Sequence, residues 1–119
     1  MSEIRLGAVE SKFADIIWNN EPLRPVELEK LAEAELNWKR TTTLTILKRL
    51  CERGIFQNKD RIITSLISRE EFYALQSEKF VNDTFEGSLP AFLTAFGSRK
   101  KLSDKEVEEF KKVIDSMRR

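Results

Sequence analysis

The side chains best suited to bind a ligand lie between Lys39 and Arg53. Apolar and small residues recur there at the spacing of a helix with one buried face, at Thr43, Ile46, Leu47 and Leu50. The neighbouring face has no acidic side chain and combines hydroxyl groups with a leucine and a lysine. Hydroxyls pair with several base edges, a leucine packs against a thymine methyl group, and a lysine reaches guanine acceptors. We therefore predict base contacts in the major groove of DNA for Thr41, Thr42, Leu44, Thr45 and Lys48.

Charge is unevenly distributed along a chain whose net charge is only +1. Residues 37–61 contain seven cations and two acids, a sum of +5, whereas residues 1–36 contain four cations and eight acids, a sum of −4. A local basic surface attracts a phosphate backbone, with an affinity that falls as salt rises. The alternative is a basic helix face that is merely solvated. We predict phosphate contacts for Lys39, Arg40, Arg49, Arg53, Lys59 and Arg61.

Two shorter helices are predicted ahead of this one. The first covers residues 7–19, and the second begins at Pro25, because proline suits the first turn of a helix, and runs to about Glu35. Trp38 lies in the connection to the third helix, where it either plugs the core or lies near the sugar-phosphate backbone. A short helix, a tight connection and a longer helix with a polar outer face follow the order of a helix-turn-helix.

A hairpin is predicted after the third helix. Gly54 ends that helix, because glycine takes positive φ freely. The β-prone runs 55–58 and 62–65 then flank a turn at residues 59–61 that carries two cations. A helix, a glycine stop and a basic-tipped hairpin form the recognition helix and wing of a winged helix-turn-helix.

The sequence of the C-terminal part predicts further helices, which carry many apolar side chains. Serine N-caps with a glutamate three residues on start helices at Ser68 and Ser103, and residues 89–96 form a short apolar helix between them. Because about 50 helical residues bury little of their surface alone, this part needs a partner, and a second copy is the simplest one. An ordinary core within one chain is the alternative. The predicted dimer interface comprises Phe72, Leu75, Phe80, Phe85, Leu89, Phe92, Leu93, Phe96, Phe110, Val113 and Ile114.

The fold class is therefore mainly α with a small β-hairpin wing. We expect an N-terminal winged helix-turn-helix domain at residues 1–67 and a three-helix dimerisation domain at residues 68–119. The chain has no run of about 18 apolar residues and no secretion signal, so we expect a cytoplasmic protein without membrane insertion.

Catalysis has few residues to use. The chain contains no histidine, one cysteine and four widely separated glycines, which excludes serine or cysteine triads with histidine and a glycine-rich phosphate loop. We expect no enzymatic activity, no cofactor and no metal site. Cys51 either packs in the core or responds to redox state or metal.

Four motifs occur in order along the chain: Leu6-Gly7-Ala8-Val9-Glu10 with Phe13 and Ile16-Ile17-Trp18; Trp38, Thr41-Thr42-Thr43, Leu47, Arg49-Leu50 and Gly54; Leu66-Ile67-Ser68-Arg69-Glu70-Glu71-Phe72; and Leu102-Ser103-Asp104-Lys105-Glu106-Val107. Together they resemble the penicillinase-repressor family, which includes the β-lactamase and methicillin-resistance operon repressors of bacteria. The resemblance covers nearly the whole chain.

The resemblance implies a homodimeric repressor in which each winged helix binds half of a palindromic operator and the C-terminal helices interlock. In antibiotic-responsive members a membrane sensor-transducer with a zinc-protease domain triggers cleavage of the repressor, typically at an Asn-Phe bond. The corresponding pair here is Ala95-Phe96, which keeps the phenylalanine and lacks the asparagine. The paired cysteines of copper-responsive relatives are absent from this sequence. A winged helix that binds protein instead of DNA is the competing interpretation.

Overall fold

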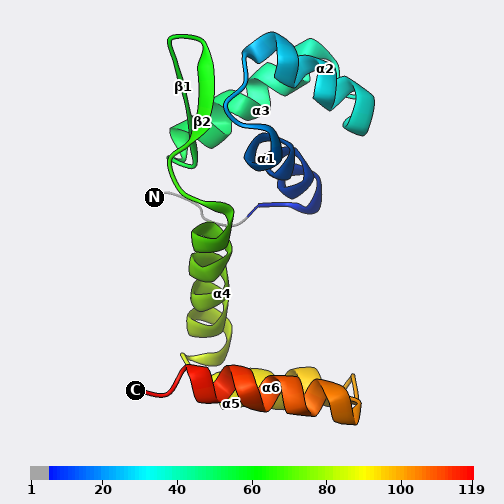
Figure 1. Ribbon diagram of the computed structural model, residues 1–119, viewed down its shortest axis with the longest axis vertical. Helices are drawn as coiled ribbons and strands as arrows, with labels where there is room; N and C mark the ends of the chain where they lie inside the picture. The colour runs from blue at the N-terminus through cyan, green and yellow to red at the C-terminus, as the bar shows by residue number, and fades with distance from the viewer. Residues whose placement is uncertain (1–5) are drawn as a thin grey trace. The chain divides into compact units, whose positions relative to one another are not determined.

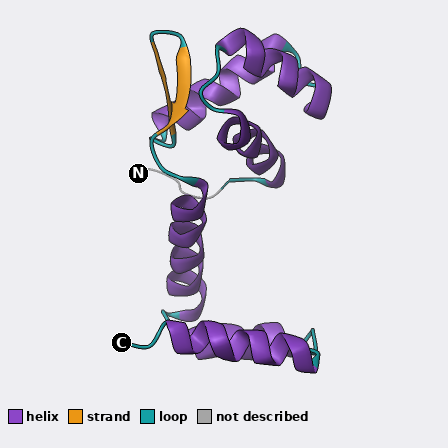
Figure 2. Ribbon diagram, in the orientation of Figure 1, coloured by secondary structure: helices purple, strands orange, loops and turns teal. Residues whose placement is uncertain are grey.

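The structure, a computed structural model, describes residues 6–119, and these divide into two compact units, of which the first ends at Ser77 and the second covers residues 78–119 (Figure 1). The regular secondary structure of the described residues consists of helices and one hairpin, which loops connect (Figure 2). The elements are α1 Ala8–Asn20, α2 Pro25–Leu36, α3 Arg40–Glu52, β1 Phe56–Lys59, β2 Ile62–Ser65, α4 Arg69–Phe85, α5 Leu89–Gly97 and α6 Asp104–Ser116. The predicted fold class is confirmed: three helices, a hairpin wing and a helical C-terminal region follow one another in the expected order.

The third helix, α3, is anchored by the predicted apolar face. Thr43, Leu47 and Leu50 are buried, and Ile46 is partly buried against the same core. Helix α2 and strand β1 pack against α3, and α1 packs against α2 and β2. The 3.6-residue period places one face of α3 in this core and leaves the opposite face outward.

The backbone adopts a left-handed conformation just after α2 and again just after α3. Asn37, just after α2, has φ 57°, and its amide donates hydrogen bonds to the last turn of α2. Gly54 has φ 81°, as predicted for the residue that ends α3. A Cβ at Gly54 would meet nothing within 4 Å, so the preference for glycine is conformational and not one of space.

The hairpin pairs Phe56 with Ser65 and Lys59 with Ile62, which leaves a loop of Asp60 and Arg61. Both loop residues have positive φ, 55° and 62°, as the central residues of a type I′ turn require. Aspartate tolerates this conformation, whereas glycine usually occupies the second position. Arginine at the second position therefore carries backbone strain.

A third extended segment, missed from the sequence, joins the hairpin. Leu23, between α1 and α2, forms an antiparallel bridge with Ile63: the Ile63 amide donates to the Leu23 carbonyl at 2.8 Å, and the Leu23 amide donates to the Ile63 carbonyl at 3.3 Å. The Glu21 carboxylate also accepts hydrogen bonds from the Ser65 amide and hydroxyl, at 2.7 and 2.9 Å. These contacts fasten the wing to the connection that precedes α2.

Aromatic side chains close the core of the first unit. The Trp18 ring lies 5.1 Å from Phe56 and 5.7 Å from Phe72, centroid to centroid, and its indole N–H donates to the Ile67 carbonyl at 3.1 Å. Trp38 lies 5.0 Å from Phe13 and is half-buried, which agrees with a place at the edge of the core.

Phe72 differs from expectation. We predicted it in a dimer interface, but it is 1% exposed and belongs to the core of the first unit. Helix α4 starts at Arg69, so Phe72 lies in its first turn and packs against Trp18. The first turns of α4, through Ser77, accordingly group with the N-terminal unit.

The second unit has an aromatic cluster and no buried side chain. Phe80, Phe85 and Phe92 lie 5.6 to 6.1 Å apart, and Phe96 stacks on Phe92 at 6.2 Å. All of residues 78–119 are described, and none of them is buried. Ser103 and Glu106 form the predicted capping box at the start of α6, with hydrogen bonds of 3.0 and 3.2 Å.

We predict that Arg61→Gly raises the free energy of unfolding by on the order of 0.5–1 kcal/mol, because the relief of left-handed strain exceeds the extra chain entropy of glycine. Thermal denaturation followed by circular dichroism measures the change. Asn58→Gly, in the neighbouring strand, is the matched control and should destabilise the hairpin. A lower unfolding temperature for Arg61→Gly would contradict the strain argument.

Candidate nucleic-acid interface

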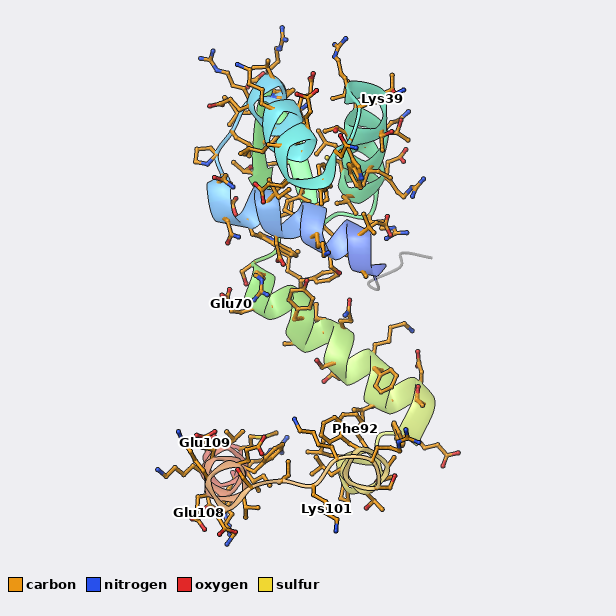
Figure 3. The ribbon with its side chains drawn as sticks, turned by 90° about the vertical axis from the view of Figure 1, so that its right-hand side faces the viewer. Lys39, Glu70, Phe92, Lys101, Glu108 and Glu109 are labelled. Carbon is orange, nitrogen blue, oxygen red and sulfur yellow. The ribbon has the colours of Figure 1, made fainter. Side chains whose placement is uncertain are left out.

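The outward face of α3 carries the predicted base-contacting side chains. Thr41, Thr42, Thr45 and Lys48 are exposed, and Leu44 is partly exposed. All of them lie on one helix whose opposite side is held in the core, so their relative positions are preset. Figure 3 labels Lys39, the residue just before the first turn of α3.

Thr43 belongs to the other face, although it follows two exposed threonines. Its side chain is fully buried, and its hydroxyl donates to the Lys39 carbonyl at 3.2 Å. The run Thr41-Thr42-Thr43 therefore divides between the two faces, as the helical period predicted.

Two of the predicted phosphate-contacting arginines are held by acids of the preceding helices. Arg40 pairs with Glu29 of α2 at 3.2 Å, and Arg49 pairs with Glu10 of α1 at 3.5 Å. The arginine side chains stay 75% and 50% exposed, so each pair contributes at most about 1 kcal/mol. A phosphate can therefore replace either carboxylate at small cost. The sequence alone did not indicate that Glu29 and Glu10 would form ion pairs with these two arginines.

The remaining predicted cations surround α3 and the wing tip. Lys39, Lys59 and Arg61 are exposed, and Arg53 is half-buried at the end of α3. Lys59 and Arg61 flank the Asp60 turn, so the wing tip has a net positive charge. The structure thus places the six predicted cations on α3, on the residues next to its ends and on the hairpin.

Cys51 is half-buried at the end of α3 and packs against the core. Burial raises the pKa of the Cys51 thiol, and the nearby Glu52 carboxylate raises it further. The thiol is therefore protonated at neutral pH, which makes it a weak nucleophile and a weak metal ligand. Among residues 6–119, no three cysteine, aspartate or glutamate side chains gather closely enough to hold a metal ion.

The predicted interface residues other than Phe72 remain on the surface to different degrees. Phe85, Phe92 and Leu93 are half-buried, the first two within the aromatic cluster, and the others are exposed: Leu75, Phe80, Leu89, Phe96, Phe110, Val113 and Ile114. Ala95 and Phe96 are exposed on α5. In Figure 3, α5 and α6 are seen nearly end-on, with Phe92 labelled on α5 and Glu108 and Glu109 on α6.

The first unit packs three helices around a buried core, and the third helix, α3, has a polar outer face. A hairpin follows, held by the Leu23–Ile63 bridge. This arrangement defines a winged helix-turn-helix protein. The family model described as penicillinase repressor matches residues 6–116, and the chain belongs to that family of transcriptional repressors.

Individual relatives agree with this membership. The chain is 24% identical to the methicillin resistance regulatory protein MecI of Staphylococcus aureus over 92% of this chain and 93% of that protein. It is 21% identical to the penicillinase repressor of Bacillus licheniformis over 93% of this chain and 90% of that protein. No helix within residues 6–119 is both long and apolar enough to cross a membrane.

The two faces of α3 should respond differently to the same substitution. We predict that Thr43→Ala lowers the free energy of unfolding by about 1–2 kcal/mol, because it removes a buried methyl group and hydroxyl. Thr41→Ala, on the outward face, should change it by less than about 0.5 kcal/mol. Urea denaturation of both variants measures the difference, and equal effects would show that the faces are wrongly assigned.

Proposed function

We propose that this repressor is a homodimer that binds a palindromic DNA operator through α3 and the wing and so blocks transcription of the gene beside it. The observation that carries the proposal is the outward face of α3, which presents exposed hydroxyls and a lysine without an acid and is ringed by cations. Methicillin resistance regulation and penicillinase repression, named for its relatives, fit this function.

In the proposed complex, α3 lies in the major groove. The hydroxyls of Thr41, Thr42 and Thr45 pair with base edges, Leu44 packs against a thymine methyl group, and Lys48 donates to guanine N7 and O6. These contacts determine which sequence is bound. The surrounding cations bind phosphates and set the register of the helix on the duplex.

Phosphate contacts require the arginines to exchange partners. Arg40 leaves Glu29, and Arg49 leaves Glu10, when each meets a backbone phosphate. Because both pairs are exposed and weak, the exchange costs little, whereas a phosphate contact releases condensed counterions from the DNA. Affinity should therefore depend steeply on salt.

We predict that the double variant Thr45→Ala/Lys48→Ala loses at least about tenfold in preference for the operator over mixed-sequence DNA, because its side chains no longer reach base edges. The operator fragment is first selected from genomic DNA with the wild-type chain. Competition between the fragment and a mixed-sequence duplex then measures the preference.

Thr94→Ala/Lys112→Ala, which makes the same changes in the second unit, is the matched control and should keep the preference. The amount of DNA that the wild-type chain retains is also measured over about 50–200 mM salt, which tests the competing protein-binding interpretation. DNA binding through several phosphates weakens by orders of magnitude over that range. Salt-insensitive binding without sequence preference would exclude the proposed function.

The second unit supports the dimer. Its helix α6 has an apolar stripe at Val107, Phe110, Val113 and Ile114, which Met117 extends just after the helix, and all of these but Val107 are exposed. A unit without a buried side chain cannot offset its own ordering entropy, so the stripe needs a cover. A second copy presents the same stripe, and a two-fold dimer lets both copies bury it. Two-fold symmetry also matches a palindromic operator with half-sites about one DNA turn, or a multiple, apart.

We predict that Phe110→Asp converts the dimer to a monomer at micromolar concentration, because each dimer would bury two unpaired charges at a cost of several kcal/mol. Sedimentation velocity measures the change. Lys112→Asp places the same carboxylate on the opposite, exposed side of α6 and should leave the dimer intact. Wild-type chain that sediments as a monomer at this concentration would rule out the dimer.

Release by proteolysis is the last part of the proposal, at the Ala95–Phe96 bond. Both residues are exposed, Phe96 by 45%, and they lie in a nine-residue helix, which is short enough to unwind at modest cost. Incubation with the zinc-protease domain of a sensor-transducer should yield a fragment that ends at Ala95, identified by mass spectrometry. An intact chain would exclude this route of release.

A further inference from the structure

A cavity of about 420 Å³ lies between the wing tip and the first turn of α2, within the first unit. Its lining joins two segments that are far apart in the sequence: Arg24, Pro25 and Val26 from the start of α2, and Asp60, Arg61 and Ile62 from the hairpin. We propose that this cavity binds a sugar-phosphate unit of the DNA backbone, with Arg24 and Arg61 on either side of the phosphate. The inference rests on the proposed function and adds Arg24, which belongs to neither α3 nor the wing.

Both arginines are available to an anion. Arg24 and Arg61 are exposed, and neither guanidinium has an ion pair or hydrogen bond within residues 6–119. Arg40 and Arg49 differ in this respect, because acids of α1 and α2 hold them. A phosphate in the cavity displaces no carboxylate from either guanidinium, so this contact forms without an exchange of partners.

The acids near the cavity are too few to cancel its charge. Asp60 is the one acid in the lining, against two arginines. Glu27 lies nearby, and its carboxylate accepts a hydrogen bond from the Arg24 amide at 2.7 Å as a cap of α2. That carboxylate offsets the positive end of the helix dipole, so the guanidinium groups provide the attraction for the anion.

The apolar part of the lining indicates which anion fits. Val26 and Ile62 are 53% and 38% exposed, and Pro25 belongs to the same lining. Bare apolar side chains beside guanidinium groups suit a ligand with both an apolar and an anionic part. The deoxyribose ring and phosphate of a DNA backbone combine the two, and protein–DNA contacts go mostly to these groups.

The geometry of the cavity is preset by the backbone. The bridge between Leu23 and Ile63 joins the residue before Arg24 to the residue after Ile62. Arg61 itself has positive φ, where glycine would avoid strain. A strained arginine at a solvent-exposed turn indicates that its side chain has a use that outweighs the strain.

The test uses the full chain and a mixed-sequence DNA duplex, so that it does not depend on the operator. Arg24→Ala and Arg61→Gly should each weaken binding by roughly twofold to fivefold, the effect of an exposed ion pair. Each should also lower the slope of log affinity against log salt by about 0.9, the change expected for one phosphate. The double variant should lose less than the product of the single losses, because both side chains bind the same phosphate.

Lys12→Ala removes an exposed cation of α1 outside this lining and should change neither affinity nor slope. Arg24→Ala that binds like Lys12→Ala, or strictly multiplicative losses in the double variant, would overturn the shared site and leave the proposed function standing. Wild-type chain that binds no duplex at about 50 mM salt would instead overturn the proposed function and this inference together.

Discussion

The proposed DNA-binding surface depends on the anchoring of α3 along one side. Thr43, Leu47 and Leu50 fill the core beneath the helix, and burial of each leucine stabilises the fold by about 1.5–3 kcal/mol. Rotation of α3 by half a turn would bring these side chains into water and turn Lys48 towards the core. The direction in which the outer face points is therefore decided by the core and not by the polar residues themselves. Recognition side chains on that face can change without a change of fold.

Electrostatic organisation follows from the same packing. The acidic helices α1 and α2 lie against the basic segment, so that Glu10 and Glu29 meet Arg49 and Arg40. These pairs lower the attraction of the surface for any anion, because part of the positive charge is already neutralised. They also hold long side chains near the helix before DNA arrives. On the proposed surface, Arg24 and Arg61 meet phosphates without an exchange of partners, whereas Arg40 and Arg49 first leave a carboxylate.

Much of this arrangement could be predicted from local sequence. The period of α3, the glycine at position 54 and the serine cap at position 103 each act within a few residues, and the structure confirms them. The Leu23–Ile63 bridge, the burial of Phe72 and the pairing of Glu29 with Arg40 could not be predicted, because each joins segments separated in the sequence. Phe72 shows the reason: an aromatic residue on an amphipathic helix is equally suited to a core and to an interface. Only the position of Trp18 distinguishes the two.

The two compact units differ in what holds them together, and this difference bears on the proposed mechanism. The first unit buries a continuous core, whereas the second exposes most of its apolar side chains. If a second copy covers those side chains, folding of the second unit and dimerisation are one process, and its stability rises with protein concentration. Two linked winged helices then bind a palindrome with an effective concentration far above that of the free protein. A single cut in α5 that separates the copies removes this advantage without touching any DNA contact. In the proposed mechanism, operator release therefore requires no change in α3, and the cut falls in the unit that has no buried side chain of its own.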